Sequence, residues 1–353
     1  MQNTDPKKNI LILATGGTIV CAESEHGLSP HYTVEDLIHC IQPVSKRVSL
    51  SGKMVMNIDS SNMTPQYWLN IAHAIEAEYQ KFDGFVITHG TDTMAYTAAA
   101  LTYIIEGLNK PIIITGSQYS LMDNETDAIQ NLTDAILFAK EELVGVFIVF
   151  DGKLINGTRA IKTKTKSYDA FHSVNYPPVA AIKHNRISYN QSVCSHFQKQ
   201  LSSAQSTTTP LTIAPKIEEK IFVLKLFPGL DPTIFDYLKE KMKGVVIESY
   251  GIGGVSSEVL DIASKVHELT QAGVAVVLTT QCLLEGVNLQ IYEVGRSMPL
   301  DKIIYGKDMN TEALVPKLMW ALGKTNDPAE VKSLVETSIR GDMLETPEQF
   351  YFS

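Results

Sequence analysis

The most constraining feature of this sequence is a recurring unit, in which a short apolar run is followed by a polar turn and then by a helical stretch. The first run, residues 10–14, leads into two glycines, and the runs at 83–87 and 110–115 lead into similar polar turns. Continuously apolar strands are typical of a sheet that is covered by helices on both faces. Their alternation with helices favours parallel neighbours joined by right-handed crossovers.

The composition along the chain predicts two α/β domains. Residues 1–190 form a larger N-terminal domain with a doubly wound, mostly parallel sheet, and residues 191–220 form a polar linker rich in Ser, Thr and Pro. Residues 221–353 form a smaller C-terminal α/β domain. We expect its strands at 221–227, 244–249 and 274–279, and its helices at 232–241, 258–272 and 327–337.

Local signals place other elements of the first domain. Thr33 and Asp36 have the spacing of a capping box, and Thr64-Pro65 has the form of an N-cap followed by the first helical residue. We also predict a loop at 22–32, helices at 65–79, 95–106 and 124–140, and a hairpin pattern at 151–166.

Composition and charge exclude several classes of protein. With 44% hydrophobic and 20% charged residues, the 353-residue chain has the composition of a globular protein. Its formal net charge of −9 offers no general attraction for nucleic acid. No apolar stretch has the length of a transmembrane helix, and the polar residues 1–8 do not resemble an export signal. We therefore expect neither a nucleic-acid partner nor a membrane.

The cysteines indicate a reducing compartment. Cys21, Cys40, Cys194 and Cys282 show no C-x-x-C pairing, which argues against a zinc site and against a disulfide framework. We therefore predict a cytoplasmic protein without a bound metal.

The first turn is the best candidate for a functional site. Thr18 follows Gly16 and Gly17 at the predicted carboxyl edge of a parallel sheet, where open α/β folds bind their ligands. Each polar residue near such an edge also has a simpler interpretation. Thr18 alone would serve as a capping hydroxyl, Asp92 alone as a helix N-cap, and Lys162 alone as a solvated surface lysine.

The motifs taken together favour the functional interpretation, because in order and spacing they resemble the bacterial L-asparaginases of the cytoplasmic type I form. The resemblance extends over nearly the whole chain. The motifs are Thr15-Gly16-Gly17-Thr18-Ile19, Asp59-Ser60-Ser61, His89-Gly90-Thr91-Asp92-Thr93-Met94, Thr115-Gly116-Ser117-Gln118 and Arg159 to Thr163.

This resemblance implies hydrolysis of the side-chain amide of L-asparagine to aspartate and ammonia, with no cofactor and no metal. Thr18 occupies the position of the family's nucleophile, and Thr91, Asp92 and Lys162 match its second catalytic group. A threonine hydroxyl needs a partner that takes its proton, and a lysine in a water-poor site can act on Thr91 while Asp92 holds it in place. Which threonine attacks first stays open at this point.

The same resemblance assigns the substrate-binding residues. An amino acid requires an anion for its α-ammonium group and hydrogen-bond donors for its α-carboxylate. Asp92 suits the first role, and Ser60 and Ser61 with their backbone amides suit the second. Backbone N–H groups near Gly90 and Thr91 are candidates for stabilising an oxyanion. The assigned set is Asp59, Ser60, Ser61, Gly90, Thr91 and Asp92.

One expected catalytic group is not found where the resemblance places it. Many family members carry a tyrosine in the loop after the nucleophile, near Gly27, and this chain has Leu28 there. Tyr32 is the nearest tyrosine in sequence. Tyr292, in the second domain, is the candidate that we expect to reach the nucleophile, with a packing role as its simpler interpretation.

Three alternatives to a dedicated asparaginase stay open. A dual asparaginase and glutaminase, or the ammonia-releasing subunit of a tRNA amidotransferase, would share the catalytic motifs. The latter usually carries an additional N-terminal domain, and only nine residues precede the first apolar run. A non-catalytic amino-acid sensor would share the fold but would need no nucleophile. The resemblance also implies a homodimer or a homotetramer.

Overall fold

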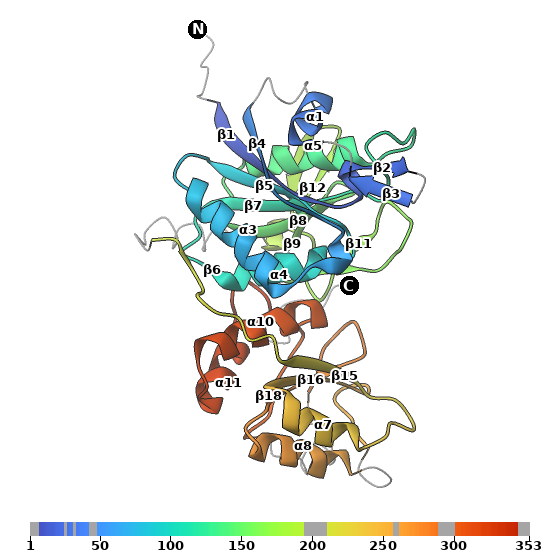
Figure 1. The fold of residues 1–353 in the computed structure, drawn as a ribbon, viewed down its shortest axis with the longest axis vertical. Coiled ribbons are helices and arrows are strands. Elements are labelled where there is room, and N and C mark those ends of the chain that lie inside the picture. Colours follow the sequence, from blue (N-terminus) through green and yellow to red (C-terminus); the bar gives the residue numbers. More distant parts are fainter. Residues whose placement is uncertain are drawn as a thin grey trace. The chain divides into compact units, whose positions relative to one another are not determined.

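The computed structural model describes residues 7–24, 27–30, 33–41, 48–193, 210–256, 261–288 and 301–344, with residues 20–24 and 27–30 described by their backbone alone. The chain forms two compact units, which Figure 1 colours along the sequence. Unit 1 comprises Met1–Ser173 and Pro177–Ile213, and unit 2 comprises Val174–Tyr176 and Ala214–Ser353.

Unit 1 is built on one mixed sheet of eight strands, in the order β13-β12-β9-β8-β7-β5-β1-β4. The five strands from β4 to β8 run parallel, and β9, β12 and β13 add antiparallel hairpins at one edge. The strands are β1 (Lys8–Gly16), β4 (Val48–Ile58), β5 (Gly84–Thr88), β7 (Pro111–Thr115), β8 (Gly145–Phe150), β9 (Lys153–Asn156), β12 (Ala180–Lys183) and β13 (Arg186–Tyr189). The prediction of a mostly parallel sheet is therefore confirmed.

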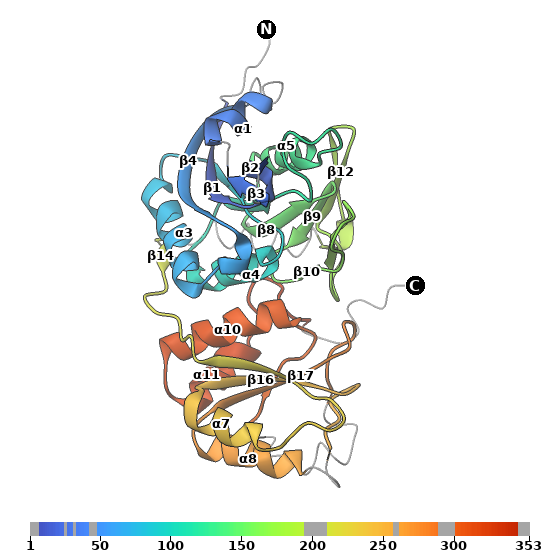
Figure 2. The ribbon, with the colours of Figure 1, turned by 45° about the vertical axis from the view of Figure 1, so that its right-hand side comes forward.

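Helices cover both faces of this sheet, as the continuous burial of β5, β7 and β8 requires (Figure 2). The helices α3 (Pro65–Glu78) and α4 (Met94–Ile104) lie together on one face, and α1 (Val34–Cys40) and α5 (Ala128–Ala139) lie on the other.

Register and close contacts confirm that α1 and α5 share a face. A Cβ at Gly52 of β4 would lie 2.3 Å from Val34 Cγ1 of α1, and one at Gly84 of β5 would lie 2.2 Å from the Ala139 oxygen of α5. Their partners in β1 are Ile12 and Ile10, which are two residues apart and point to the same face.

One crossover contradicts the prediction that all are right-handed. The connections through α4 and α5 step in the same direction along the sheet, yet they cross opposite faces, so their hands are opposite. The α3 connection has the direction and face of α4, and the α1 connection reverses both, so these three share one hand. The α5 connection, between β7 and β8, is the exception and has the uncommon left hand. The long segment 116–127 that precedes α5 carries the chain to the other face, and the Asp127 carboxylate fixes it by accepting the N–H groups of Gln118 and Tyr119.

Several local predictions are confirmed. Thr33 and Asp36 form the capping box of α1, with the Asp36 N–H at 3.2 Å from Thr33 Oγ1. Pro65 is the first residue of α3, although the Thr64 side chain makes no cap hydrogen bond. The hairpin pattern near residue 151 is the β8–β9 turn, and the Arg159 segment leads into β10 (Ala160–Lys162), which pairs with β11 (Phe171–Ser173).

Three predicted elements differ from the structure. The segment 22–32 is not a plain loop, because β2 (Cys21–Ser24) and β3 (Gly27–Pro30) form an antiparallel ribbon. The helix predicted at 95–106 ends at Ile104, because β6 (Ile105–Glu106) pairs with β14 (Thr212–Ile213). The helix predicted at 124–140 begins only at Ala128.

Unit 2 contains a four-stranded parallel sheet in the order β15-β16-β17-β18. One cluster of its core consists of aliphatic side chains with Phe235, and among the described residues four helices pack with the sheet. The strands are β15 (Ile221–Lys225), β16 (Gly244–Ser249), β17 (Ala275–Thr280) and β18 (Ile304–Tyr305), and the helices are α7 (Ile234–Lys241), α8 (Ile262–Gln271), α10 (Thr311–Lys324) and α11 (Pro328–Glu336). The predicted second α/β domain is confirmed, and α10 and β18 were not predicted.

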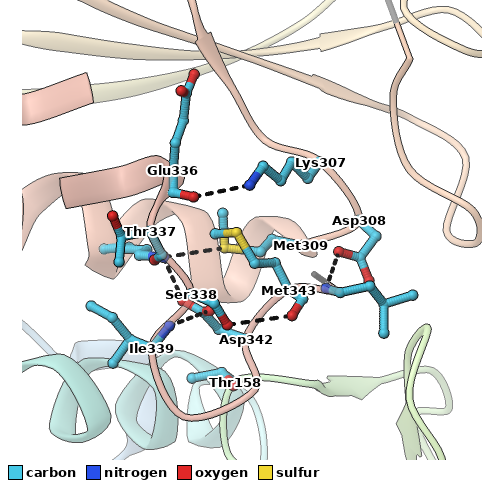
Figure 3. Close-up of polar contacts among 12 residues, drawn as sticks. Thr158, Lys307, Asp308, Met309, Glu336, Thr337, Ser338, Ile339, Asp342 and Met343 are labelled. Atoms are coloured by element: carbon cyan, nitrogen blue, oxygen red, sulfur yellow. Dashed lines mark hydrogen bonds and ion pairs between the residues drawn. The ribbon is translucent and has the colours of Figure 1, made fainter. Parts of the chain in front are cut away.

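Unit 2 also contains a fully buried ion pair. Lys317 Nζ of α10 lies 2.6 Å from Asp342 Oδ2, and neither side chain is exposed to solvent. The same ammonium donates to the Thr337 carbonyl oxygen at 2.7 Å, and Asp342 Oδ1 accepts the Ile339 N–H at 2.8 Å. Figure 3 shows Ile339 and Asp342 of the segment that follows α11, joined by this last hydrogen bond.

Candidate active site

The polar residues of unit 1 gather at a topological switch point. From β1 the chain moves first to β4, on one side, and then to β5, on the other, so the strand order reverses between β1 and β5. Open α/β sheets bind their ligands outside the carboxyl ends of the strands at such a point. Thr18 follows β1 and Thr91 follows β5, so the fold brings both predicted hydroxyls to this edge.

Glycines allow the turns at this edge to pack closely. Gly17 has a φ of +86°, and a Cβ there would lie 2.5 Å from the Gly90 nitrogen. Gly16 has a φ of +102°, and a Cβ there would lie 2.4 Å from the Ile58 oxygen at the end of β4. No side chain larger than hydrogen fits at either position. The turn that carries Thr18 therefore lies directly against the turn that carries Thr91.

Hydrogen bonds join the same turns. Thr15 Oγ1 donates to the Thr88 carbonyl oxygen at 2.8 Å, which connects the ends of β1 and β5. Thr93 Oγ1 donates to the Ser60 carbonyl oxygen at 2.8 Å, which ties in the turn after β4. Ser60 is buried, and its Oγ would lie 2.5 Å from a Cβ at Gly90. The three turns form one packed unit.

Lys162 is not the solvated lysine that its sequence neighbourhood suggests. It lies at the end of β10, and its Nζ donates to Thr91 Oγ1 at 2.7 Å and to Asp92 Oδ1 at 2.6 Å. The Lys162 side chain is only 18% exposed, whereas that of Asp92 is 63% exposed. The structure thus brings together Thr91, Asp92 and Lys162, an arrangement in which an amine contacts a nearly buried hydroxyl.

Asp92 does not cap the helix that follows it. Helix α4 begins at Met94, its N-cap is Thr93, and no side chain caps it. The cap interpretation of Asp92 is therefore wrong for this structure, and its carboxylate contacts Lys162 instead.

Asp59 organises the turn after β4. Its Oδ1 accepts both the backbone N–H and the hydroxyl of Ser61, each at 2.8 Å. These bonds, the backbone one first, hold the pKa of the Asp59 carboxyl below its usual value of 3.8. The Ser61 N–H is therefore directed at Asp59, and the exposed carboxylate stays ionised at neutral pH.

His89 is buried and neutral. Desolvation lowers the pKa of its imidazole to about 4, against a smaller opposing effect of the hydrogen bond to Gly90. Its two ring nitrogens contact the Gly90 carbonyl oxygen and Thr97 Oγ1. These contacts are those of a buried, hydrogen-bonded structural residue rather than of a general base.

The residues that hold the site together were not predicted from the motifs. Thr15 and Thr93 tie the turns, and Thr97 joins α4 to His89. A signal for Thr97 does exist, because it is a polar residue within an alanine-rich, fully buried stretch of α4.

The predictions that concern the side chains of Leu28, Tyr32 and Tyr292 lie outside the described residues.

Two further features bear on the kind of site this chain can hold. In the described part of the chain, no group of three or more His, Cys, Asp or Glu residues could hold a metal ion. None of the helices in that part is both long and apolar enough to cross a bilayer.

Fold and site together define a two-domain α/β protein with threonine hydroxyls, an amine and carboxylates at the switch point of its larger sheet. Comparison with known families is consistent with this class. Residues 9–194 match the family model described as asparaginase, N-terminal, and residues 220–335 match the glutaminase/asparaginase C-terminal domain. The chain belongs to the asparaginase family.

Two curated relatives carry different names. The chain is 34% identical over 360 residues to a glutamyl-tRNA(Gln) amidotransferase subunit of Methanosphaera stadtmanae, covering 99% of this chain and 80% of the relative. It is 33% identical over 336 residues to the L-asparaginase of Thermococcus kodakarensis, covering 95% of this chain and 98% of the relative.

Solved structures show the same fold. The thermostable L-asparaginase from Thermococcus kodakarensis matches with a TM-score of 0.86 at 31% identity, covering 96% of this chain and all of that one. L-asparaginase I from Vibrio cholerae matches with a TM-score of 0.84 at 30% identity and the same coverages.

Proposed function

We propose that this protein hydrolyses the side-chain amide of L-asparagine to L-aspartate and ammonia, with Thr18 as the nucleophile. The contact of Lys162 Nζ with Thr91 Oγ1 and Asp92 is the observation that supports this best, because a binding protein has no need of an amine on a buried hydroxyl. We further propose a cytoplasmic, type I enzyme that assembles as a homodimer or homotetramer and needs no cofactor.

The reaction proceeds through an ester. Thr18 Oγ1 bonds to the amide carbon, and the carbonyl electrons move to oxygen. As the carbonyl re-forms, the C–N bond breaks and the nitrogen leaves as ammonia, carrying the proton that the Thr18 hydroxyl has given up. Water then attacks the ester and releases aspartate. Thr91 and Lys162 serve this second step, because the amine can take the hydroxyl proton as the hydroxyl activates water or stabilises the intermediate.

The two ends of an amino acid match groups at this edge. Asp92 Oδ1 contacts Lys162, and its largely exposed carboxylate can also accept an α-ammonium group. Ser60, Ser61 and Gly90 lie in the turns that would face an α-carboxylate. The Ser61 N–H already donates to Asp59, so its role is to stabilise the turn. We therefore propose Ser60 as the residue that donates a hydrogen bond to the α-carboxylate of the substrate.

Selectivity for asparagine over glutamine follows from fixed anchor points. A site that holds both charged groups of the amino acid places the amide carbon at one distance from Thr18. One additional methylene displaces it from the attack geometry.

A second candidate function rests on the relatives. Several matched proteins of about one third identity are named as a subunit of glutamyl-tRNA(Gln) amidotransferase, so an ammonia-releasing subunit with a protein partner is the alternative. A dual asparaginase and glutaminase has the same chemical requirements, whereas a non-catalytic sensor is disfavoured by the Lys162–Thr91 contact.

Ammonia release separates these functions. The purified chain alone is assayed with L-asparagine and with L-glutamine, each over a range of concentrations. We expect kcat/KM for asparagine to exceed that for glutamine by at least about 100-fold. Comparable values would indicate the dual enzyme, and release of ammonia only after a partner subunit is added would indicate the amidotransferase. Binding of asparagine without any ammonia release would indicate the sensor.

A further inference from the structure

His89 lies beside the candidate site, yet the proposed reaction uses neither of its nitrogens. The residue is 1% exposed. Nδ1 lies 2.7 Å from the Gly90 carbonyl oxygen, and Nε2 lies 2.9 Å from Thr97 Oγ1. A neutral imidazole has one donor nitrogen and one acceptor nitrogen, so the partners decide which nitrogen carries the proton.

The direction of the hydrogen-bond chain fixes the tautomer. Trp68 Nε1 can only donate, and it donates to Thr97 Oγ1 at 3.0 Å. The Gly90 carbonyl can only accept, so the single proton of the neutral ring lies on Nδ1 and is donated to it. Nε2 is then the acceptor, and the Thr97 hydroxyl donates to it. The chain thus runs in one direction from α3 through α4 to the Gly90 carbonyl.

The far end of this chain sets the orientation of one peptide group. The C=O and N–H of a trans peptide point in opposite directions, and no described peptide bond is cis. With the Gly90 carbonyl held toward the buried His89, the Thr91 N–H points away from the core. Across the described residues no acceptor takes this N–H, although Thr91 is only 8% exposed.

We propose that His89 is a positioning residue, which holds the Gly90 carbonyl so that the Thr91 N–H donates to the oxyanion formed when Thr18 attacks the amide carbon. This inference rests on the proposed function. A donor fixed in advance costs no reorganisation during the reaction, and loss of one such donor lowers kcat by about 100- to 1,000-fold in other enzymes.

The competing interpretation is that His89 only fills the core. Replacement would then lower stability and activity together, whichever nitrogen the new side chain imitates. The two amide side chains separate these interpretations, because the Asn amide nitrogen can take the place of Nδ1 and the Gln amide oxygen that of Nε2. His89→Asn retains a donor for the Gly90 carbonyl, and His89→Gln retains only the acceptor for Thr97.

The experiment compares kcat, KM and melting temperature of wild type, His89→Asn, His89→Gln and Thr97→Val. The last variant removes a hydroxyl from the same core without changing the donor to Gly90, so it is the matched control. We expect kcat to fall about 100-fold in His89→Gln, with KM within about threefold of wild type. In His89→Asn and Thr97→Val, kcat should stay within about fivefold. Equal kcat values for the Asn and Gln variants would overturn the proposal.

A crystallographic arm keeps this test separate from that of the proposed function. Crystals of His89→Asn and His89→Gln are compared for the orientation of the peptide between residues 90 and 91. We expect it unchanged in the Asn variant and rotated in the Gln variant, and an unchanged peptide in both would contradict the inference. A wild-type protein that releases no ammonia from either amide would overturn the proposed function, and the peptide orientation would still decide the role of His89.

Discussion

The two units each contain a lysine that lies 2.6 Å from an aspartate oxygen, and the two pairs have different surroundings. Lys317 and Asp342 of unit 2 are wholly buried; the lysine also contacts the Thr337 carbonyl oxygen and Met309 Sδ, and the aspartate accepts the Ile339 N–H. Lys162 of unit 1 is partly exposed, Asp92 is mostly exposed, and the second partner of the lysine is a hydroxyl. The distance within an ion pair therefore does not show whether the pair stabilises the fold or takes part in a reaction.

The second partner distinguishes them. A backbone carbonyl can only accept a hydrogen bond from the lysine, so we assign the Lys317 pair a structural role in unit 2. A threonine hydroxyl can both accept and donate, so Lys162 and Thr91 can exchange a proton. The exposed Asp92 carboxylate leaves room for a ligand, whereas Asp342 leaves none.

The largest expected effect is the loss of turnover in Lys162→Met. The substitution retains an unbranched apolar stem and removes the amine, so we expect kcat to fall by about 1,000-fold or more at an unchanged melting temperature. Ammonia release and thermal unfolding measure the two quantities. Lys164→Met, two residues along the same basic stretch, is the control, and its activity should equal that of wild type. Similar activity in both variants would show that Lys162 is a structural lysine.

Lys317→Met should give the opposite result. It removes the ammonium group that lies 2.6 Å from the buried Asp342 carboxylate, so we expect the free energy of unfolding to fall by about 3–5 kcal/mol. The kcat of the folded fraction should stay within about twofold of wild type. Denaturant unfolding checks the first expectation, and Lys317→Met combined with Asp342→Asn should recover part of the loss. A single variant as stable as wild type would contradict the structural role.

A third carboxylate extends the comparison, because Asp134 of α5 is buried like Asp342 but its hydrogen-bond partner is a glutamine rather than a lysine. Gln130 Nε2 donates to it at 2.8 Å, and burial raises the pKa of Asp134 from 3.8 to about 6. The folded state binds this proton more tightly than the unfolded chain does. Stability from this group is therefore greatest below pH 4 and falls as the pH rises to about 6.

Asp134→Asn removes that titration and retains an acceptor for Gln130. We expect a gain of up to about 3 kcal/mol in unfolding free energy at about pH 7.5, which should vanish below about pH 4. Urea unfolding across this range measures the gain. A difference that does not vary with pH would mean that Asp134 is already neutral or already paired.

The smallest expected effect concerns the scaffold of the Lys162 site. Thr93→Val removes the hydrogen bond to the Ser60 carbonyl and retains the shape of the side chain, so we expect a loss of about 1 kcal/mol in stability. The kcat should fall by less than about tenfold, because no reacting group is removed. A loss as large as that of Lys162→Met would place Thr93 among the reacting groups.

The sequence predicted the elements of the fold well where local signals determine them. Continuous apolar runs identified β1, β5 and β7, and the capping box at Thr33 identified the start of α1. The hand of the α5 crossover was not predictable in this way, because the rule is statistical and the exception depends on how residues 116–127 fold. The pairing of β6 with β14 joins segments about 100 residues apart, which no local pattern indicates.

For the site, spacing and resemblance predicted the residues but not their contacts. Thr91, Asp92 and Lys162 do meet, although Lys162 is about 70 residues away from the other two. The tie between Thr93 and Ser60 was missed, because a turn threonine carries no mark of its distant partner. The Lys317–Asp342 pair was missed for the same reason, since a lysine on a predicted helix is ordinarily exposed.

The most direct test of the central claim is to identify the threonine that carries the ester. Wild type and Thr91→Val are mixed with L-asparagine, quenched in acid during turnover, digested and analysed by mass spectrometry. We predict an aspartyl ester on Thr18 in both proteins, accumulating to a higher fraction in Thr91→Val because its hydrolysis is slowed, and none in Thr18→Val. An ester on Thr91 in wild type, or rapid turnover by Thr18→Val, would contradict the assignment of Thr18 as the nucleophile.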